Sequence, residues 1–431
     1  MLALRIDAIG RNLAIVRITN ISTSDFPPFG QLDLAFPALD SSKSPPNERL
    51  GEVQILTGIN GTGKSRLLCC LAAALGNPVP LERKLSVGRS ANVKVRAERY
   101  VTDVVQKGQI SRNALSAIGM PPLRAVAYSG TAYITDQPVS VMAKIPAPQF
   151  GELLEFNKPA GYGRNAAQLI SNMKIKAVMA AMQQSQQNAA RTSAAARPLK
   201  LMALIENGLS DITGRPFVFR VEEREKDQNG VVVDWGHASM PFSLLPDGLR
   251  SIIGWLVDAA VMLDYMMPDG PEPLAEPCVL LLDEIECHLH PAWQRKILPI
   301  AQRVFRNAQI FVATHSPFVI CSLNEGWIHK LKMDDGGIVT AETPVQAKPG
   351  DSYISVMEDI MGVDEWFDPD THRLLDDFRV ERDKALRGDG TAVSAAKEKA
   401  AALQARGPEV ADIMGREMRQ LDRLLAQPLA K

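Results

Sequence analysis

The chain has 431 residues, of which 48 are basic, 49 are acidic and 46% are apolar. This length allows two or three domains, and the near balance of charge excludes a generally basic nucleic-acid coat while leaving room for a local basic patch. The sequence shows no apolar stretch near the roughly 18 residues of a membrane span and no signal-peptide layout at its start. The five cysteines form no C-x-x-C pair and are expected to be buried free thiols in a reducing cytoplasm, without a membrane partner.

Two strands are predicted near the start of the chain, over Leu13–Thr19 and Gln31–Phe36, with a turn at Phe26-Pro27-Pro28 between them. They lead to a buried strand, Val53–Leu56, and then to an apolar helix that ends before Gly76-Asn77-Pro78. A glycine-rich loop lies between this strand and this helix.

The loop over residues 58–65 reads Gly-Ile-Asn-Gly-Thr-Gly-Lys-Ser, a complete G-x-x-x-x-G-K-S phosphate-binding motif. Its glycines, Gly58, Gly61 and Gly63, allow backbone N–H groups to turn inward around phosphate oxygens at a helix N-terminus. Lys64 is expected to reach the β- and γ-phosphates, and the Ser65 hydroxyl to bind Mg²⁺. The motif predicts a nucleoside triphosphate site, and its flanking strand and helix disfavour the alternative of a glycine-rich turn without a ligand. The other predicted nucleotide contacts are Asn60, Thr62 and Arg66.

Residues 79–240 are predicted to form an insertion into the nucleotide-binding domain, with helical and β structure. Its first part holds basic residues from Arg83 to Arg99, and the whole segment lacks the sustained heptads of a long coiled coil. The predicted elements are a buried strand at Leu123–Tyr128, helical structure between Asn165 and Leu209, and a hairpin of Phe217–Glu222 and Val231–Trp235 across Asn229-Gly230.

A second apolar strand, Val279–Leu282, delivers Asp283 and Glu284 at its C-terminal end, where parallel sheets bind ligands. Asp283 is expected to hold Mg²⁺ through water beside Ser65, and Glu284 to polarise the water that attacks the γ-phosphate. Two acids after an apolar run are a weak signal alone and a strong one downstream of a phosphate-binding loop.

Three of the histidines that follow this acidic strand are candidates for a functional role. A further predicted strand, Gln309–Ala313, ends in Thr314-His315-Ser316-Pro317, and His315 is expected to hydrogen-bond the γ-phosphate. A structural histidine at a strand end is the alternative. His288 and His290 are candidate metal ligands, but their spacing and the lack of a third ligand nearby in the sequence disfavour that interpretation.

A turn that contains a glycine, Phe242–Ser251, precedes the acidic strand and leads into an apolar helix, Ile252–Met262. Such a turn at a helix N-terminus is an anion site, and a plain helix cap formed by Asp247 is the alternative. The last part of the chain is charged and predicted to be helical, with breakers at Gly388-Asp389-Gly390 and Gly407-Pro408.

Taken in chain order, these motifs resemble the parts of an ABC-type ATPase. The loop over 58–65, the turn over 243–251, Asp283-Glu284, the segment over 286–290 and His315 match its Walker A, signature, Walker B, D-loop and switch histidine. The chain contains the motif Asp-Glu-Ile-Glu-Cys-His-Leu-His-Pro and, further along, Ala-Thr-His-Ser-Pro. These two motifs resemble those of the RecF/OLD/SMC-like branch more than those of membrane transporters. Within that branch the chain resembles OLD-family ATPases and the ATPase subunits of bacterial anti-phage systems such as Septu and PARIS.

The resemblance implies an α/β fold, an ABC/RecF-like P-loop ATPase head with an inserted helical/β subdomain and a helical C-terminal region. It implies ATP and Mg²⁺ as cofactors, with Lys64, Glu284 and His315 as the catalytic groups. The implied parts are 1–78 with Walker A, the insertion 79–240, 241–345 with the remaining motifs, and the helical region 346–431.

In proteins of this type two heads sandwich ATP, so the resemblance implies a homodimer or higher oligomer in which Gly248 of one head contacts the nucleotide of the other in trans. Where the family has Leu-Ser-x-Gly, this chain reads Leu245-Pro246-Asp247-Gly248. The signature hydroxyl is therefore missing unless Ser243 or Ser251 substitutes for it. The candidates for the Q-loop are Ser129, Gly130 and Gln137.

The leading interpretation is an ATPase subunit of a bacterial defence complex that gates or recruits a separate effector. No nuclease domain is recognised in this sequence, because Asp334-Asp335 follows the wrong element for the Toprim nuclease domain of OLD proteins. A separate nuclease is therefore the expected effector. One alternative is a RecF-like DNA repair or chromosome-maintenance ATPase that clamps DNA with the basic residues from Arg83 to Arg99. A solvated charged segment is the favoured interpretation of those residues. The other alternative is a nucleotide-dependent scaffold with little turnover, which the presence of Pro246 in the signature favours.

Overall fold

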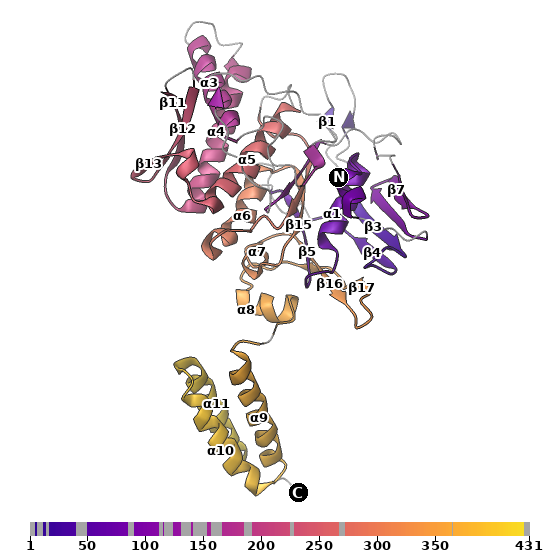
Figure 1. Cartoon of the computed structure of the whole chain (residues 1–431), viewed down its shortest axis with the longest axis vertical. Helices are drawn as coiled ribbons and strands as arrows, with labels where there is room; N and C mark the ends of the chain where they lie inside the picture. Colours follow the sequence, from indigo (N-terminus) through magenta and orange to yellow (C-terminus); the bar gives the residue numbers. More distant parts are fainter. Residues whose placement is uncertain are drawn as a thin grey trace. The chain divides into compact units, whose positions relative to one another are not determined.

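The structure is a computed structural model that forms two compact units, Met1–Val356 and Met357–Lys431 (Figure 1). The residues that it describes are 5–6, 12–13, 17–39, 50–84, 90–111, 115, 124–130, 139–140, 153–156, 166–184, 192–224, 228–266, 272–363 and 365–425.

The larger unit is built on a seven-stranded, mostly parallel sheet. Its strands are β5 (Glu52–Thr57), β9 (Arg124–Ser129), β14 (Cys278–Asp283), β15 (Ala308–Ala313), β16 (Trp327–Met333), β17 (Val339–Ala341) and β18 (Val345–Gln346). They lie in the order β17-β16-β5-β15-β14-β9, with β18 also paired to β16. The pairs from β9 through β16 are parallel, and β14 and β15 are buried along their whole length, as expected for a parallel sheet covered on both faces.

A second sheet of five antiparallel strands lies beside the first in this unit. Its strands, in the order β4-β3-β6-β7-β8, are β4 (Leu32–Ala35), β3 (Ile18–Ser24), β6 (Asn92–Ala97), β7 (Tyr100–Gln106) and β8 (Gln109–Ile110). Helix α1 (Lys64–Leu75) contacts strands of both sheets and is buried from Leu67 to Leu75. The apolar side chains of α1 therefore join the two sheets into one core.

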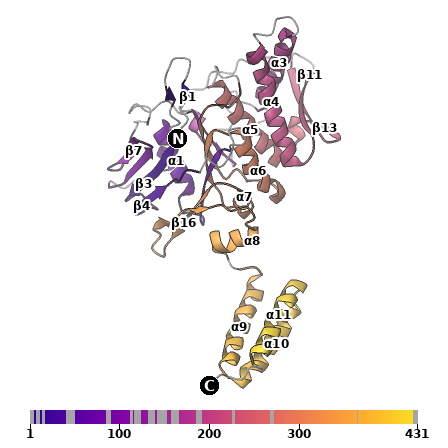
Figure 2. The same ribbon diagram turned by 180° about the vertical axis from the view of Figure 1, so that it is seen from behind.

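Helices cover the other face of the central sheet. They include α5 (Asp247–Tyr265) and α6 (Pro291–Val304), which Figures 1 and 2 show on the side of the sheet opposite α1. Beside them lie α3 (Ala166–Gln184), α4 (Thr192–Thr213) and a four-stranded sheet. This sheet contains β10 (Val139–Ser140), β11 (Phe217–Arg224), β12 (Gln228–Trp235) and β13 (Ala238–Pro241). The remaining short elements of the unit are β1 (Arg5–Ile6), β2 (Asn12–Leu13), α2 (Val79–Lys84), a 3₁₀ turn (Phe242–Leu244), α7 (Pro317–Ile320) and α8 (Tyr353–Ser355).

Residues 79–240, which are predicted to form an insertion, contribute strands to both sheets of the larger unit. Strand β6 pairs with β3, and β9 pairs with β14 in the central sheet. Residues 90–110 and 124–129 are therefore integral parts of the two sheets of the head, and their pairing with distant strands is not visible in local composition. All of the predicted domain boundaries, including those of the insertion 79–240, stay predictions.

Two local predictions need correction. Of the predicted strand Leu13–Thr19, Leu13 belongs to β2, residues 14–16 lie outside the described residues, and the strand β3 that overlaps its end runs over Ile18–Ser24. The predicted hairpin exists, but Arg224 pairs with Gln228, so that Asn229 and Gly230 lie within β12 and not in its turn. By contrast, α1 ends at Gly76, as predicted, and Gly76 adopts the positive φ of 122° that favours glycine.

The smaller unit contains three helices with a core of their own, centred on Phe378, Ala396 and Leu403. The helices are α9 (Pro369–Leu386), α10 (Gly390–Gln404) and α11 (Pro408–Leu425), and a short π-helical segment (Val356–Ile360) precedes them. The breaks between them fall at the predicted Gly388-Asp389-Gly390 and Gly407-Pro408. Within the described ranges, every helix is too short or too polar to traverse a lipid bilayer.

A buried polar pair joins β5 to β16 in the larger unit. The His329 ring nitrogen Nε2 lies 2.7 Å from Oε1 of Gln54, and its ring packs edge-on against Phe36 at 5.3 Å between ring centroids. Burial lowers the pKa of His329 to about 4. The histidine is therefore neutral in the folded protein near neutral pH.

His329 should make the stability of the larger unit depend on pH. Its folded pKa of about 4 lies below the value of about 6.5 expected in the unfolded chain, so its stabilising contribution is complete above pH ~6.5 and is lost as pH falls toward 4. Over that window we expect the free energy of unfolding of the wild type to fall by up to about 3 kcal/mol more than that of His329→Gln. The glutamine keeps a donor for Gln54 and does not titrate. Urea unfolding followed by circular dichroism measures the two slopes, and equal slopes would contradict the assignment.

Candidate nucleotide-binding site

The phosphate-binding loop connects β5 to α1 with a backbone that only glycine accommodates at two positions. Gly58 has a φ of +152°, and a Cβ there would lie 2.3 Å from the carbonyl oxygen of Leu331. Gly63 has a φ of +83°, and a Cβ there would lie 2.5 Å from the ring of Phe29. The loop is therefore held against β16 and against the segment between β3 and β4, and its last glycine places Lys64 and Ser65 in the first turn of α1.

Lys64 is buried at the base of this loop. Its Nζ donates hydrogen bonds to the carbonyl oxygens of Gly58 at 2.8 Å and Ile59 at 3.1 Å. Burial lowers the pKa of Lys64 to about 8, against the opposing effect of the nearby carboxylates of Glu284 and Asp283. The ammonium thus lies where a phosphate would meet it, and it is easier to deprotonate than an ordinary lysine.

Ser65 and Asp283 meet across the site. The Ser65 hydroxyl donates to Oδ1 of Asp283 at 2.8 Å. The backbone carbonyl of Asp283 accepts from Gly130 at 2.9 Å, so the Q-loop candidate Gly130, with Ser129 before it, lies directly beside the acidic strand end. A hydroxyl and a carboxylate are ligands that suit Mg²⁺, and their contact brings them together as predicted. The other Q-loop candidate, Gln137, lies outside the described residues.

The alternative metal site finds no support in the described residues, where no group of three His, Cys, Asp or Glu side chains is placed to hold a metal. His290 is instead the N-cap of α6, and its Nδ1 accepts from the backbone N–H of Ala292 at 3.2 Å. His288 is exposed, with a positive φ of 65°.

Glu284 and His315 lie close together at the same site. Nε2 of His315 lies 3.5 Å from Oε1 of Glu284, and the Glu284 N–H donates to the carbonyl of Ala313 at 2.9 Å. Burial and the charge of Lys64 lower the pKa of His315, against the opposing charge of Glu284. The imidazole is therefore mostly neutral near pH 7.

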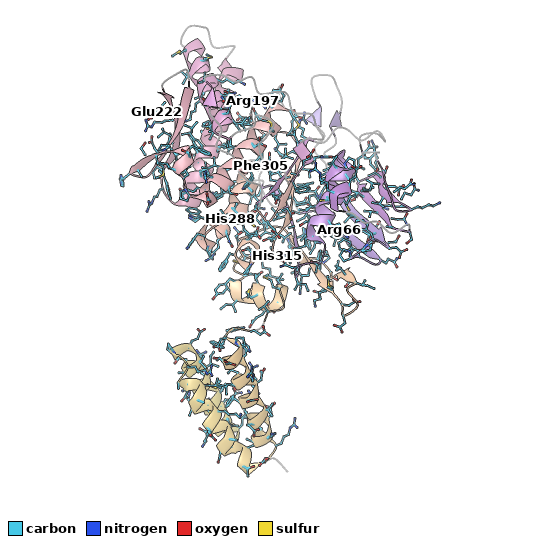
Figure 3. The ribbon with its side chains drawn as sticks, in the orientation of Figure 1. Arg66, Arg197, Glu222, His288, Phe305 and His315 are labelled. Carbon is cyan, nitrogen blue, oxygen red and sulfur yellow. The ribbon has the colours of Figure 1, made fainter. Side chains whose placement is uncertain are left out.

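These residues surround a cleft of about 910 Å³. Arg66 reaches it from α1 and His315 from the segment after β15 (Figure 3). The Arg66 guanidinium also donates to the Pro27 carbonyl and lies 5.8 Å from the ring centroid of Phe26. The lining residues are Pro27, Pro28, Asn60, Gly61, Gly63, Lys64, Ser65, Arg66, Glu284, His315 and Gly337. Of the predicted loop contacts, Thr62 is instead fully buried and donates to the Ile59 carbonyl at 2.9 Å.

The signature turn does not line this cleft. Gly248 is buried against the D-loop of its own chain, and a Cβ there would lie 2.7 Å from the His288 carbonyl. Helix α5 begins at Asp247, with Pro246 as its N-cap residue, so the predicted cap by Asp247 is wrong; the Asp247 carboxylate accepts a hydrogen bond from Arg250 instead. The role of Gly248 in trans stays a prediction.

Residues 186–321 match the family described as "AAA domain, putative AbiEii toxin, Type IV TA system". The chain is 35% identical to the Retron Ec83 probable ATPase of Escherichia coli over 102 residues, which cover 24% of this chain and 19% of that protein. It is 25% identical to the Septu protein PtuA of Bacillus thuringiensis over 170 residues, which cover 38% of this chain and 43% of that protein. The predicted resemblance to ABC/SMC-like ATPases of anti-phage defence is confirmed. The chain spans less than half the length of either relative.

A solved structure with a similar arrangement is the Smc head domain with an extended coiled coil, bound to the C-terminal domain of ScpA, derived from Pyrococcus furiosus. It aligns with a TM-score of 0.43 at 12% identity and covers 77% of this chain and 96% of that chain.

One buried residue beside this candidate site was not predicted individually from the sequence. Glu286, in the segment predicted as the D-loop, is 8% exposed and bonds to the backbone of the switch histidine, His315. A carboxylate between the apolar residues Ile285 and Cys287 is the signal that marks it, since a charged side chain in such a position must find buried partners.

Proposed function

We propose that this chain binds ATP with Mg²⁺ in the cleft beside Lys64 and hydrolyses it. The observation that supports this most strongly is the meeting of two pairs at one edge of the sheet, Ser65 with Asp283 and Glu284 with His315. The ends of β14 and β15 and the start of α1 supply these four side chains, although they are far apart in the sequence. A magnesium-binding pair next to a general base is what phosphoryl transfer to water requires.

Each side chain has a separate part in the proposed reaction. When ATP binds, the Lys64 ammonium donates its hydrogen bonds to phosphate oxygens instead of to the carbonyl oxygens of Gly58 and Ile59. Glu284, at the cleft surface, accepts a proton from the attacking water, and the neutral His315 donates its ring N–H to the γ-phosphate. Ser65 and Asp283 would hold Mg²⁺, which supplies positive charge against the charge that develops on the phosphates.

We infer that two copies close around ATP, with the signature turn of one facing the Walker A loop of the other. The turn lies outside the cleft of its own chain, so it would reach a bound phosphate only from a second copy. Exposed apolar side chains flank both parts: Leu244 beside the signature is 70% exposed, and Ile59 in the loop is 61% exposed. Association would remove these side chains from water.

Leu244→Glu should therefore weaken ATP-dependent association by about tenfold or more, the effect of losing one central apolar contact. The fold should be unaffected, because Leu244 is 70% exposed in the single chain. Val380→Glu is a matched control, since Val380 is 52% exposed on α9 in the smaller unit. Sedimentation with ATP in a Glu284→Gln background measures the effect. If Leu244→Glu associates as tightly as the Val380→Glu control, this turn lies outside the interface.

The similarity to PtuA of Septu and to a retron ATPase supports a further proposal, that this ATPase acts in the cytoplasm against phage by gating or recruiting a separate effector, expected to be a nuclease. The test is the plating efficiency of phage on cells that carry the native locus. Replacing Lys64 by Ala in that locus should abolish protection, whereas Lys397→Ala, a change at an exposed lysine of α10, should not. Equal protection by both would contradict an ATP-dependent role in defence.

A DNA-clamping role is a second candidate, favoured by a polar groove of about 660 Å³ on the antiparallel sheet. Lys94 and Arg96 line it beside Asn20 and Asn92. An ion pair between Lys94 and Asp103 at 3.8 Å partly neutralises its charge. If DNA binds there, its affinity should fall steeply with salt, and DNA binding that is absent or independent of salt would exclude this candidate.

A further inference from the structure

We propose that Glu286 is a positioning residue that fixes His315 relative to Glu284, and that it acts as a hydrogen-bond acceptor and not as a charge. The inference rests on the proposed ATP hydrolysis, since the position of His315 matters for that reaction. Glu286 is not among the residues that line the cleft, and its carboxyl group contacts Thr314 and the backbone of His315, so it is assigned a positioning role.

The first observation is that one oxygen of Glu286 accepts two hydrogen bonds from the segment that follows β15. Oε1 accepts from the hydroxyl of Thr314 and from the backbone N–H of His315, the latter at 3.2 Å. Thr314 is fully buried, and Glu286 is 8% exposed. The carboxyl group thus holds the backbone of the residue whose imidazole faces Glu284.

The second observation is that further bonds tie the same two loops together. The Thr314 hydroxyl accepts from the Ser316 N–H at 2.9 Å, and the Ser316 hydroxyl donates to Gln294 at 2.6 Å. Gln294 in turn donates to the carbonyl of Leu289 at 3.0 Å. The loop after β14 and the loop after β15 are therefore one connected network, and Glu286 lies at its centre.

The third observation concerns the other oxygen of Glu286. Oε2 is buried and has no hydrogen-bond partner among the described residues. An ionised oxygen in that position would lose its hydration without compensation, which is far more costly for a charge than for a neutral group. Burial raises the pKa of Glu286, against the opposing effect of the hydrogen bonds that the carboxyl group accepts from Thr314 and from backbone N–H groups. The group that the network needs is thus the acceptor at Oε1, which a neutral carboxyl or an amide also supplies.

The carboxyl groups of Glu284 and Glu286, which belong to the same loop, are therefore assigned different roles. Glu284 is half-buried at the cleft and lies 3.5 Å from the imidazole of His315, in position to take a proton. Glu286 lies behind it and contacts the backbone of His315, in position to orient that imidazole. The difference in their surroundings, and not in their chemistry, separates the roles.

The experiment compares Glu286→Gln with Glu286→Leu in the full chain. The glutamine retains an acceptor for Thr314 and His315, whereas the leucine has a similar length and removes it. We expect the leucine variant to lower kcat for ATP by about ten- to a hundredfold, the effect of losing a buried hydrogen bond at a reacting group, with the Kd for ATP within about threefold of the wild type. The glutamine variant should stay within about threefold of the wild type in both quantities. Glu398→Gln, at an exposed position of α10, is the control for the loss of a carboxylate.

A second readout does not depend on turnover. The pKa of His315, followed by NMR of the labelled histidine ring and assigned with His315→Gln, should shift in Glu286→Leu and stay at the wild-type value in Glu286→Gln. If the leucine variant does not fold, Thr314→Val tests the same network, because it removes one of the two donors to Oε1. It should lower kcat without changing the Kd for ATP.

Wild-type kcat and an unchanged His315 pKa in the leucine or valine variant would overturn the positioning role. A glutamine variant as impaired as the leucine variant would overturn the acceptor role and assign the effect to charge. If the wild type binds ATP but shows no turnover at all, the proposed function fails, and the histidine titration still decides whether Glu286 sets the position of His315.

Discussion

In Glu284→Gln, ATP hydrolysis is expected to fall by about a hundred- to ten-thousandfold, the range for loss of a general base, while ATP still binds. Among the described residues, Glu284 is the carboxylate that lines the cleft, and it lies 3.5 Å from His315. The amide has nearly the same shape, but it cannot accept a proton from water at any pH near neutrality. The rate of phosphate release by the purified chain with Mg²⁺ measures the effect.

The control for this prediction is Glu398→Gln, which removes a carboxylate from an exposed position of the smaller unit. Hydrolysis at the wild-type rate in Glu284→Gln would show that another group activates the water. Slow or absent turnover in both the wild type and the variant, with ATP bound to each, would favour the nucleotide-dependent scaffold over an ATPase.

Lys64→Ala should weaken ATP binding by about a hundredfold or more, because two charge-assisted hydrogen bonds to phosphate are each worth about 1.5–3 kcal/mol. The lysine donates hydrogen bonds to two loop carbonyls, those of Gly58 and Ile59. A bound phosphate would accept these hydrogen bonds in place of the carbonyls. The glycines of the loop and its packing on Phe29 do not depend on the lysine, so the loop should keep its shape. A fluorescent ATP analogue measures the Kd, with the exposed Lys397→Ala as the control.

The affinity of the protein for ATP should also fall as the pH rises, because Lys64 loses its proton. The free protein loses the Lys64 proton as pH rises through about 8. Binding requires the ammonium, so wild-type affinity for ATP should decline above that pH, by up to about tenfold per pH unit, whereas Lys64→Ala should lack this decline. An affinity of the wild type that is flat from pH 7 to 9 would contradict this account of the lysine.

The parts of the site that the sequence reveals are those in which neighbouring residues make the structure. The loop over 58–65 and the pair Asp283-Glu284 each follow an apolar strand directly, and the meeting of parallel strand ends at one edge then brings them together. The end of α1 at Gly76 is equally local, because a positive φ after a helix favours glycine.

The parts that the sequence does not reveal depend on contacts between distant residues. The pairing of β6 with β3 places residues 92–97 in the antiparallel sheet, which their local composition does not reveal. The burial of Gly248 against the carbonyl of His288 is likewise a packing relation between two separate motifs. It also means that Gly248 variants would disturb the chain itself, so Leu244 is the better position at which to test an interface.

The account as a whole describes an ATP-driven switch, in which ATP joins two copies and its hydrolysis separates them. The most direct test is the mass in solution of Glu284→Gln, measured by light scattering without nucleotide, with ADP and with ATP, each with Mg²⁺. The account predicts twice the mass of a single chain with ATP and a lower association state with ADP or no nucleotide. An unchanged mass in all three conditions, with ATP shown to be bound, would contradict it.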